Sequence, residues 1–245
     1  MQYLKPIFKC NDNVDQKNFK KSKCLLTISV GQEVHEGDKF AATIDLVNEA
    51  FGSCILLIDD SLQRHSMALN QKENADFFYK ASMLAGDLWL ERNKKHYEKL
   101  QNLESIIRWD KWLQHPDYSQ KQHQINRLIL EDKNYQSALD STVHQFLKRY
   151  VHRLQDPRFN ILRAETLCAD YLIEECSAFC LWPEMGCHYE VYPSKRNLVM
   201  METHERFVLP HHANSLCAIS IKFKQRKQFK PQFEGAKYDI CIENH

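Results

Sequence analysis

The chain lacks long hydrophobic runs. Its longest apolar stretches, such as residues 54–58, are far shorter than the roughly 20 apolar residues that a membrane-spanning helix needs. Residues 1–23 are polar and rich in lysine without the apolar core of a signal peptide, so we expect no export signal. A hydrophobic content of 43% with 27% charged residues argues against a disordered chain. These features together predict a globular cytoplasmic protein without membrane contact.

Cysteine patterns typical of disulfide frameworks and zinc sites are also missing. The 245 residues include 9 cysteines, an odd number in a long chain for which no export is expected. Cys176, Cys180, Cys187 and His188 follow none of the common paired-cysteine spacings of zinc sites. We therefore expect reduced, mostly buried cysteines and no bound metal. The net charge of +1 does not indicate a nucleic-acid partner by itself.

Two short apolar runs predict buried strands. Residues 23–30 stop at Gly31, and residues 53–58 form a second run that stops at Asp59. Between them, apolar residues recur at helical spacing over residues 38–50. A strand, a helix and a second strand in this order predict a parallel sheet with right-handed crossovers. The fold class is therefore α/β, a parallel sheet flanked by helices.

The rest of the chain predicts helices followed by late strands. Helix formers dominate residues 74–154, where Pro116 is the sole proline, so several long helices are expected there. A further helix is expected over residues 156–182, with Asp156 as its cap, and strands over residues 188–192 and 216–221. No repeat, low-complexity block or linker is visible. We therefore divide the chain into a polar arm, residues 1–22, and a single α/β domain, residues 23–245.

Ser29 is the first candidate for chemistry. It lies at the carboxyl end of the first predicted strand and is followed by Gly31 and Gln32, while the second strand ends at Asp59 and Asp60. Ligands of open α/β sheets bind beyond the carboxyl ends of the strands, so these residues are expected to gather around a crevice. A serine hydroxyl there could act as a nucleophile. The alternative is a loop serine that bonds its own turn, because the Gly-x-Ser-x-Gly elbow of hydrolases is absent.

Tyr171 and Glu175 are the second candidates. They lie four residues apart on a predicted helix and so share one face, where a phenol and a carboxylate could relay a proton or hold an ammonium group. Tyr192 and Pro193 close a predicted strand, so Tyr192 could point into the same crevice. Each element alone is also typical of a packed tyrosine or a solvated glutamate. As a set with Ser29 they indicate an active site.

A basic stripe is the third feature. Arg92, Lys94, Lys95 and Lys99 lie on or next to one predicted helix, where such side chains can neutralise backbone phosphates without reading sequence. The alternative is a solvated charged face, because glutamates lie nearby. Residues 222–230 alternate basic and aromatic side chains and form a second basic stretch, whose contact with RNA stays open.

Taken together, these segments resemble the cyclodipeptide synthase family. The resemblance rests on four stretches that cover most of the chain: residues 25–32 (LLTISVGQ), 57–65 (LIDDSLQRH), 171–175 (YLIEE) and 191–193 (VYP). It implies a Rossmann-like domain similar to the catalytic domain of tyrosyl- and tryptophanyl-tRNA synthetases. It also implies an enzyme that joins the amino acids of two aminoacyl-tRNAs into a cyclic dipeptide, a 2,5-diketopiperazine.

The resemblance further implies roles for individual residues. Ser29 would carry aminoacyl and dipeptidyl intermediates in a ping-pong reaction, Tyr171 and Glu175 would hold the amino group and move protons, and Tyr192 would face them. Substrate contacts are expected from Leu25, Thr27, Gly31, Gln32, Asp59, Ala178 and Pro193. Gln32 and the Tyr-Pro pair resemble the branch that lacks an asparagine after the serine. Thr27 stands where many members have glycine, a departure that bears on the shape of the first amino-acid pocket.

The expected chemistry is ester exchange, so neither ATP nor a metal is expected as a cofactor, and a monomer is favoured. The basic stripe would hold tRNA phosphates. Three other interpretations remain open. An RNA-binding module could use the basic segments with Ser29 purely structural, and a serine hydrolase could use the same sheet. A tRNA synthetase fragment is the third, although His-Ile-Gly-His-like and Lys-Met-Ser-Lys-Ser-like motifs are missing.

Overall fold

The structure, a computed structural model, describes residues 4–10, 14, 16–70, 74–148, 160–213 and 215–225. Its described strands form one sheet of six strands in the order β1-β6-β5-β2-β3-β4. The strands are β1 (Leu4–Cys10), β2 (Lys23–Ser29), β3 (Ser53–Asp59), β4 (Leu103–Arg108), β5 (Tyr189–Tyr192) and β6 (Cys217–Gln225). All neighbouring pairs are parallel except β1 with β6, so the sheet is Rossmann-like with one antiparallel edge strand.

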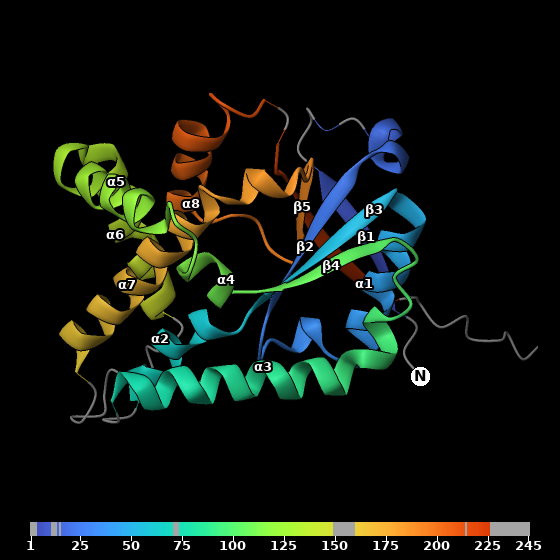
Figure 1. The fold of residues 1–245 in the computed structure, drawn as a ribbon, viewed down its shortest axis with the longest axis horizontal. Coiled ribbons are helices and arrows are strands. Elements are labelled where there is room, and N and C mark those ends of the chain that lie inside the picture. The colour runs from blue at the N-terminus through green and yellow to red at the C-terminus, as the bar shows by residue number, and fades with distance from the viewer. Residues whose placement is uncertain are drawn as a thin grey trace, which may run out of the picture.

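Helices cover both faces of this sheet (Figure 1). The α-helices are α1 (Gly37–Ala50), α2 (Arg64–Met67), α3 (Ala75–Tyr97), α4 (Asp110–Leu113), α5 (Tyr118–Glu131), α6 (Lys133–Leu147), α7 (Ile161–Phe179) and α8 (Leu198–Thr203). Shorter 3₁₀ segments include η1 (Gln16–Lys21), η2 (Glu33–His35), η3 (Ser61–Gln63) and η6 (Trp182–Met185). Among the described residues, none of the helices combines the length and apolarity that a membrane crossing requires.

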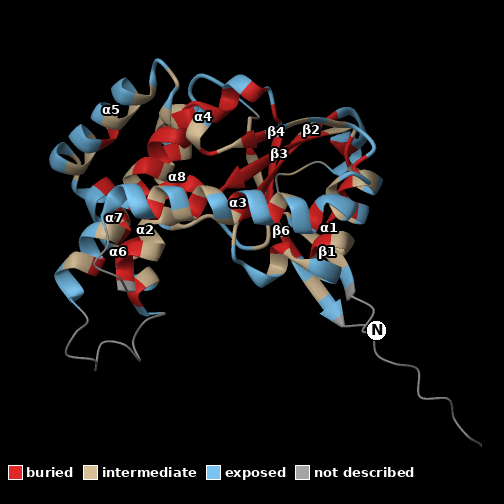
Figure 2. Cartoon of the chain, turned by 60° about the horizontal axis from the view of Figure 1, so that its bottom comes forward, coloured by how far each residue is buried: buried red, intermediate tan, exposed pale blue. Residues whose placement is uncertain are grey.

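Two apolar clusters hold the layers together. In β2, Leu25 joins the cluster under α5, α6, α7 and α8, whereas Leu26 and Ile28 join the cluster under α1 and α3. Successive residues of a strand point to opposite faces, so a strand that is apolar at nearly every position is covered on both sides. The buried colour of Figure 2 accordingly concentrates in the strands, while α5 and the outer face of α3 are exposed.

The strand order creates a switch point between β2 and β5. From β2 the chain proceeds outward through β3 and β4, and it later returns to the other side of β2 as β5 and β6. Adjacent crossovers therefore diverge at the carboxyl ends of β2 and β5, which is where open α/β sheets bind ligands. Ser29 is the last residue of β2, and Tyr192 is the last residue of β5.

The predicted order of the central elements is confirmed. Residues 23–30, 38–50 and 53–58 form β2, α1 and β3, and residues 188–192 and 216–221 contribute to β5 and β6. The helix of Tyr171 and Glu175 is α7, which begins after Asn160, whose side chain accepts a hydrogen bond from Arg163 N. The predicted cap, Asp156, lies outside the described residues.

Two expectations were wrong. Residues 74–154 were expected to be helical where described, yet they include β4, a short edge strand that is too exposed and too mixed in composition to be recognised by its pattern. Residues 1–22 were expected to be a polar arm, yet residues 4–10 form β1. The apolar side of β1 packs Phe8 against Phe19 and Phe51, at ring-centroid distances of 5.8 and 5.6 Å. Lys5 and Lys9, on the other side of the strand, gave the segment the polar composition that led to the wrong prediction.

The packing of α3 against the end of β3 gives a stability prediction. A Cβ on Gly86 would lie 2.5 Å from Asp60 Oδ2, 2.7 Å from Asp60 Cβ and 2.8 Å from Arg108 Nη2. Alanine normally stabilises a helix interior by about 1 kcal/mol relative to glycine, but overpacking costs about 1–3 kcal/mol. We expect Gly86→Ala to lower the free energy of unfolding in denaturant titration. Leu84→Ala, at an exposed position of the same helix, should change it little, and a stabilised Gly86→Ala would contradict this packing.

Candidate active site

A cavity of about 710 Å³ opens at the switch point. All four predicted catalytic residues line it: Ser29, Tyr171, Glu175 and Tyr192. Four predicted substrate contacts line it as well: Thr27, Gln32, Asp59 and Pro193. Side chains that are far apart in the sequence therefore meet in one place, as the strand order requires.

The other three predicted contacts lie elsewhere. Leu25 and Ala178 are completely buried in the apolar cluster beneath the cavity. Gly31 forms the turn after β2 with a φ of 87°, a left-handed conformation that favours glycine. Glycine is therefore needed at position 31 for the backbone turn, and the next residue, Gln32, lines the cavity.

Ser29 is held by contacts on three sides. Its Oγ lies 3.0 Å from Tyr192 Oη and 3.5 Å from Asp59 Oδ2. Its backbone N–H donates a 3.0 Å hydrogen bond to Nδ1 of His35, a buried residue that the sequence did not single out. Burial lowers the pKa of His35 to about 4, so this imidazole is neutral and can accept that bond. Trp89 Nε1 in turn donates to the His35 carbonyl at 3.0 Å and fixes the turn.

Tyr171 and Glu175 sit on the face of α7 that lines the cavity. Burial raises the pKa of Glu175 to about 8, and the charge of Glu190 adds to this shift. Glu175 Oε2 is buried without a hydrogen-bond partner among the described residues. Burial also raises the pKa of Tyr171 well above its usual value, and the neighbouring carboxyl groups of Glu175 and Asp59 raise it further. Glu175 therefore has no cationic partner among the described residues, although Lys195 and Arg196 also line the cavity.

Two more acidic residues face this cavity. Burial raises the pKa of Asp59 well above its usual value, and the charges of Glu175, Glu190 and Asp60 raise it further. Glu190 is compensated, because Arg196 Nε donates to its Oε2 at 2.7 Å. Across from them, burial raises the pKa of Tyr192 to about 12, so its hydroxyl keeps its proton.

Several cavity residues were missed by the sequence analysis. Glu190, Arg196 and Asn197 line the cavity from β5 and the segment before α8, and Gln63 lines it from η3. Glu190 and Tyr192 are two residues apart on β5, so the period of two in a strand could have placed their side chains on the same face. Gln63 and Asn197 carry no such signal, because only the tertiary structure brings their segments to α7.

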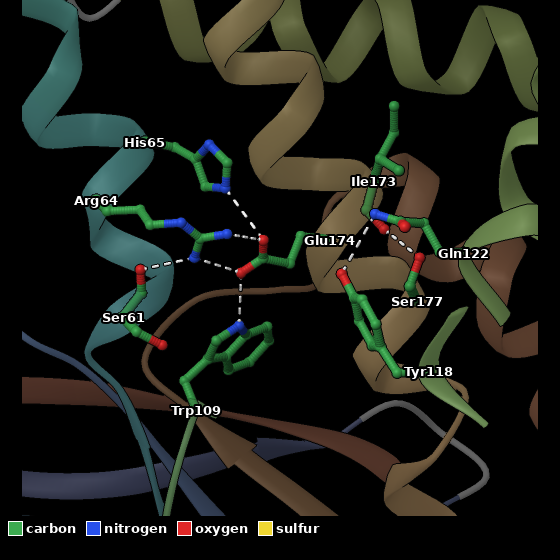
Figure 3. A network of polar contacts seen from close by, with 9 residues as sticks. All are labelled: Ser61, Arg64, His65, Trp109, Tyr118, Gln122, Ile173, Glu174 and Ser177. Carbon is green, nitrogen blue, oxygen red and sulfur yellow. Dashed lines mark hydrogen bonds and ion pairs between the residues drawn. The ribbon is translucent and has the colours of Figure 1, made fainter. Parts of the chain in front are cut away.

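Glu174, which is not among the residues that line the cavity, holds α7 through a polar network (Figure 3). Arg64 makes a bidentate ion pair with it, through Nη1 at 2.7 Å and through Nη2. Trp109 Nε1 donates to its Oε1 at 2.9 Å, and His65 Nε2 lies 3.2 Å from its Oε2. Burial alone would raise the pKa of Glu174, but the bonds and charges of His65 and Arg64 lower it overall. The network joins α2, the end of β4 and α7, and so fixes the face that carries Tyr171 and Glu175.

The predicted basic stripe lies on and just after α3. Arg92 Nη2 pairs with Glu36 Oε1 at 2.7 Å, and Lys94 lies 3.6 Å from Glu98. Lys95 and Lys99 are exposed and form no ion pair with a described residue. Of the second basic stretch, Lys222 and Lys224 are exposed on β6, and residues 226–230 lie outside the described residues.

Among the described residues, the cysteines do not gather into a ligand set. Those within the described residues are free, and Cys176 of α7 and Cys180, which directly follows α7, are buried in the apolar core. Burial raises the pKa of Cys176 above its usual range and that of Cys180 to about 12, so both thiols stay protonated. Elsewhere in the described part of the chain, His115, Asp117 and Glu184 bring their ligand atoms within 4.8 Å of one another at the surface.

The chain is similar to solved cyclodipeptide synthases. It is 39% identical to one from Fluoribacter dumoffii, with a TM-score of 0.87 and coverage of 91% of this chain and 100% of that one. A cyclodipeptide synthase from Candidatus Glomeribacter gigasporarum, solved bound to Phe-tRNAPhe, is 17% identical, with a TM-score of 0.72 and coverage of 87% and 92%.

A more distant structure relates the fold to tRNA synthetases. It is a Mycobacterium tuberculosis protein described as showing that cyclodipeptide synthetases are related to type I tRNA synthetases. The two chains are 11% identical, with a TM-score of 0.63 and coverage of 89% of this chain and 94% of that one. No protein-family model and no curated protein matches the chain.

The Glu174 network yields a second stability prediction. Glu174→Ala leaves Arg64 and Trp109 Nε1 without their acceptor in a largely buried environment. Removing one partner of a buried ion pair costs about 3–5 kcal/mol, and because the Arg64 side chain keeps 20% exposure, we expect about 2–3 kcal/mol in denaturant titration. Glu165→Ala, at an exposed position of the same helix, is the matched control. Equal losses for the two variants would show that the network does not anchor α7.

Proposed function

The chain belongs to the cyclodipeptide synthase family, and from this premise we propose that it assembles its cyclic dipeptide on Ser29. The observation that supports this most strongly is the position of Ser29 Oγ, 3.0 Å from Tyr192 Oη at the cavity where Tyr171 and Glu175 also lie. A nucleophile at the rigid end of a central strand is pre-oriented for attack. The cavity next to it has room for an aminoacyl ester.

The proposed reaction consists of three acyl transfers. Ser29 Oγ attacks the ester of a first aminoacyl-tRNA and releases the tRNA, forming an aminoacyl-enzyme. The free amino group of this intermediate then attacks the ester of a second aminoacyl-tRNA, which gives a dipeptidyl-enzyme. The new terminal amine closes on the Ser29 ester and releases the diketopiperazine. Each step forms one acyl bond and breaks one ester, so we propose that neither ATP nor a metal takes part.

Glu175 is proposed to bind the amino group of the bound aminoacyl moiety. Its pKa of about 8 means that it is largely neutral in the empty cavity at neutral pH. An ammonium group nearby favours the ionised carboxylate, and the buried Oε2, which lacks a partner among the described residues, is available to accept its hydrogen bond. Tyr171, one turn earlier on α7, keeps its own proton, so its hydroxyl is placed to relay the proton that the amine must lose before it attacks.

The finer position within the family is also a proposal. Gln32 stands where one branch has an asparagine after the serine, and Pro193 follows Tyr192. Both line the cavity, so we assign the chain to the branch that lacks the asparagine and carries Tyr-Pro. Because aminoacyl-tRNAs are made in the cytoplasm, we propose that the enzyme works there.

The proposed tRNA surface begins with the α3 stripe. Arg92, Lys94, Lys95 and Lys99 would contact phosphates of the first tRNA. Two of these four side chains already have acidic partners, Glu36 and Glu98, so their attraction for phosphate is reduced.

A second basic surface, the lysine ribbon, is formed by Lys5, Lys9, Lys222 and Lys224. The antiparallel register places Lys5 opposite Lys224, Ile7 opposite Lys222 and Lys9 opposite Ser220. Opposite residues of an antiparallel pair point to the same face of the sheet, so the four lysine side chains lie on one face. Ser220, in register with Tyr192, shares that face, and the ribbon thus continues the floor of the cavity. None of the four pairs with a described acidic residue. Like charges directly opposite each other are destabilising, so a polyanion is a favourable partner.

Product analysis tests the role of Ser29. Incubation of the wild-type chain with charged tRNAs should yield a cyclic dipeptide, detected by mass spectrometry, and should also identify the amino acids joined. Ser29→Ala keeps the cavity and should form no product, because no hydroxyl remains to accept the acyl group. A cyclic dipeptide from Ser29→Ala would contradict the proposal. Free amino acid as the sole wild-type product would instead support a hydrolase, and no reaction at all would support an RNA-binding module.

Charge removal tests the two basic surfaces. Replacing Lys5, Lys9, Lys222 and Lys224 by glutamine should weaken aminoacyl-tRNA binding. The plot of log association constant against log salt concentration should become less steep by about 3, because fewer counterions are released from the tRNA when fewer phosphates are contacted. The same change at Arg92, Lys94, Lys95 and Lys99 should have a smaller effect. Glutamines at Lys80, Lys111, Lys133 and Lys148 remove equal charge elsewhere and are the control. A control variant that binds as weakly as the ribbon variant would contradict the assignment.

A further inference from the structure

We propose that Asp59 is the proton acceptor of Ser29. Its Oδ2 takes the Oγ proton as Oγ attacks the aminoacyl ester, and then gives that proton to the ribose oxygen that leaves. The inference rests on the proposed function, because it requires Ser29 to be the nucleophile. It adds a catalytic role to a residue otherwise expected only to contact substrate.

Backbone pairing fixes the distance between the two side chains. Ser29 and Asp59 are register partners at the carboxyl ends of the adjacent parallel strands β2 and β3. Both are buried, with exposures of 7% and 5%, and both line the cavity. Their Oγ–Oδ2 distance of 3.5 Å is long, as hydrogen bonds of catalytic groups often are before substrate binds.

Hydrogen-bond accounting directs the Ser29 proton toward Asp59. Once substrate is bound and Asp59 is ionised, its carboxylate can only accept, so Ser29 Oγ then donates to Asp59 Oδ2. The single hydroxyl proton is then committed, and the contact with Tyr192 must run from Tyr192 O–H to Oγ. The resulting chain, Tyr192 to Ser29 to Asp59, leaves Oγ a free lone pair for attack.

The other nearby groups are poor acceptors for this proton. Nδ1 of His35 already accepts the backbone N–H of Ser29, and burial keeps the pKa of that ring at about 4. Tyr192 holds its own proton, because burial raises its pKa to about 12. A carboxylate whose basicity is raised by its surroundings is better matched to a serine hydroxyl than an ordinary aspartate.

The surroundings of Asp59 make it such a base. Facing it are Ser29 from β2, Tyr171 and Glu175 from α7, Tyr192 and Glu190 from β5, and its chain neighbour Asp60. Arg196 pairs with Glu190 and Arg108 with Asp60, which leaves Asp59 without a cationic partner among the described residues. Its Oδ1 is likewise buried without a donor. The ammonium group of the arriving aminoacyl moiety offsets the charge of Glu175, which otherwise raises the pKa of Asp59, and so favours ionisation of Asp59 when the ester is bound.

The step is balanced. A bond forms between Ser29 Oγ and the acyl carbon, and the bond between that carbon and the tRNA ribose oxygen breaks. The Oγ proton moves to Asp59 Oδ2 and from there to the ribose oxygen, which leaves as a hydroxyl. In the tetrahedral intermediate, Ser29 Oγ and the ribose oxygen are attached to the same carbon. Asp59 Oδ2 can therefore accept the proton from one of these oxygens and donate it to the other.

Single-turnover acylation tests this role. The chain is mixed with one kind of aminoacyl-tRNA, quenched at intervals, and the adduct on the peptide that contains Ser29 is quantified by mass spectrometry. Asp59→Asn keeps the shape of the side chain but is no base, so we expect acylation to slow by about 10²–10⁴-fold. The dissociation constant for the aminoacyl-tRNA should rise by much less than this factor, because Glu175 remains in the cavity to bind the amino group. Acylation by Asp59→Asn within about threefold of wild type would overturn the proposal.

Chemical rescue separates a lost base from a distorted site. Formate should accelerate acylation by Asp59→Ala, or by Asp59→Gly if the alanine variant folds poorly, relative to chloride at the same ionic strength, because it restores a carboxylate beside Oγ. Failure of formate with both variants would overturn the role of Asp59. A wild-type chain without any adduct on Ser29 would overturn the proposed function itself, whereas a wild-type adduct with an unaffected Asp59→Asn overturns the Asp59 proposal alone.

Discussion

The parallel pairing of β2 with β3 is the constraint on which the site depends. It places Ser29 directly opposite Asp59, and the return of the chain to the other side of β2 brings Tyr192 within 3.0 Å of the same oxygen. These positions are set by backbone hydrogen bonds in the centre of the sheet, which are among the least deformable parts of a domain. The nucleophile is therefore oriented before substrate arrives, and α7 contributes Tyr171 and Glu175 to the lining of the cavity.

Charge distribution around the cavity follows a second rule. Asp59 and Glu175 are buried on the cavity side of the sheet and α7 without cations, while Glu174, Glu190 and Asp60 are paired with arginines. Paired carboxylates stabilise the framework, whereas burial and then the charge of Glu175 raise the pKa of the unpaired Asp59. An uncompensated acidic cavity is costly in the free chain and favourable when a cationic amino group enters it. The same cost that weakens the empty site thus contributes to recognition of the aminoacyl group.

The sequence predicted those parts of the site that local periodicity defines. Apolar runs located β2 and β3, and with them Ser29 and Asp59, and a four-residue spacing placed Tyr171 and Glu175 on one helical face. It gave Glu174 no role, since the partners of Glu174 come from segments more than sixty residues away. β1 was missed because the exposed Lys5 and Lys9 interrupt its apolar residues, and its pairing partner β6 lies at the other end of the described chain. The partners of Glu174 and of β1 are both far away in the sequence, and no local pattern encodes such long-range contacts.

Covalent attachment of both intermediates to one serine is the central claim, and peptide mapping tests it most directly. The wild-type chain would be quenched during turnover with two aminoacyl-tRNAs that carry different isotopes, digested, and analysed by tandem mass spectrometry. The account predicts two adducts, one aminoacyl and one dipeptidyl, both on Ser29. An adduct on any other residue, or dipeptidyl-tRNA accumulating without an enzyme adduct, would contradict it.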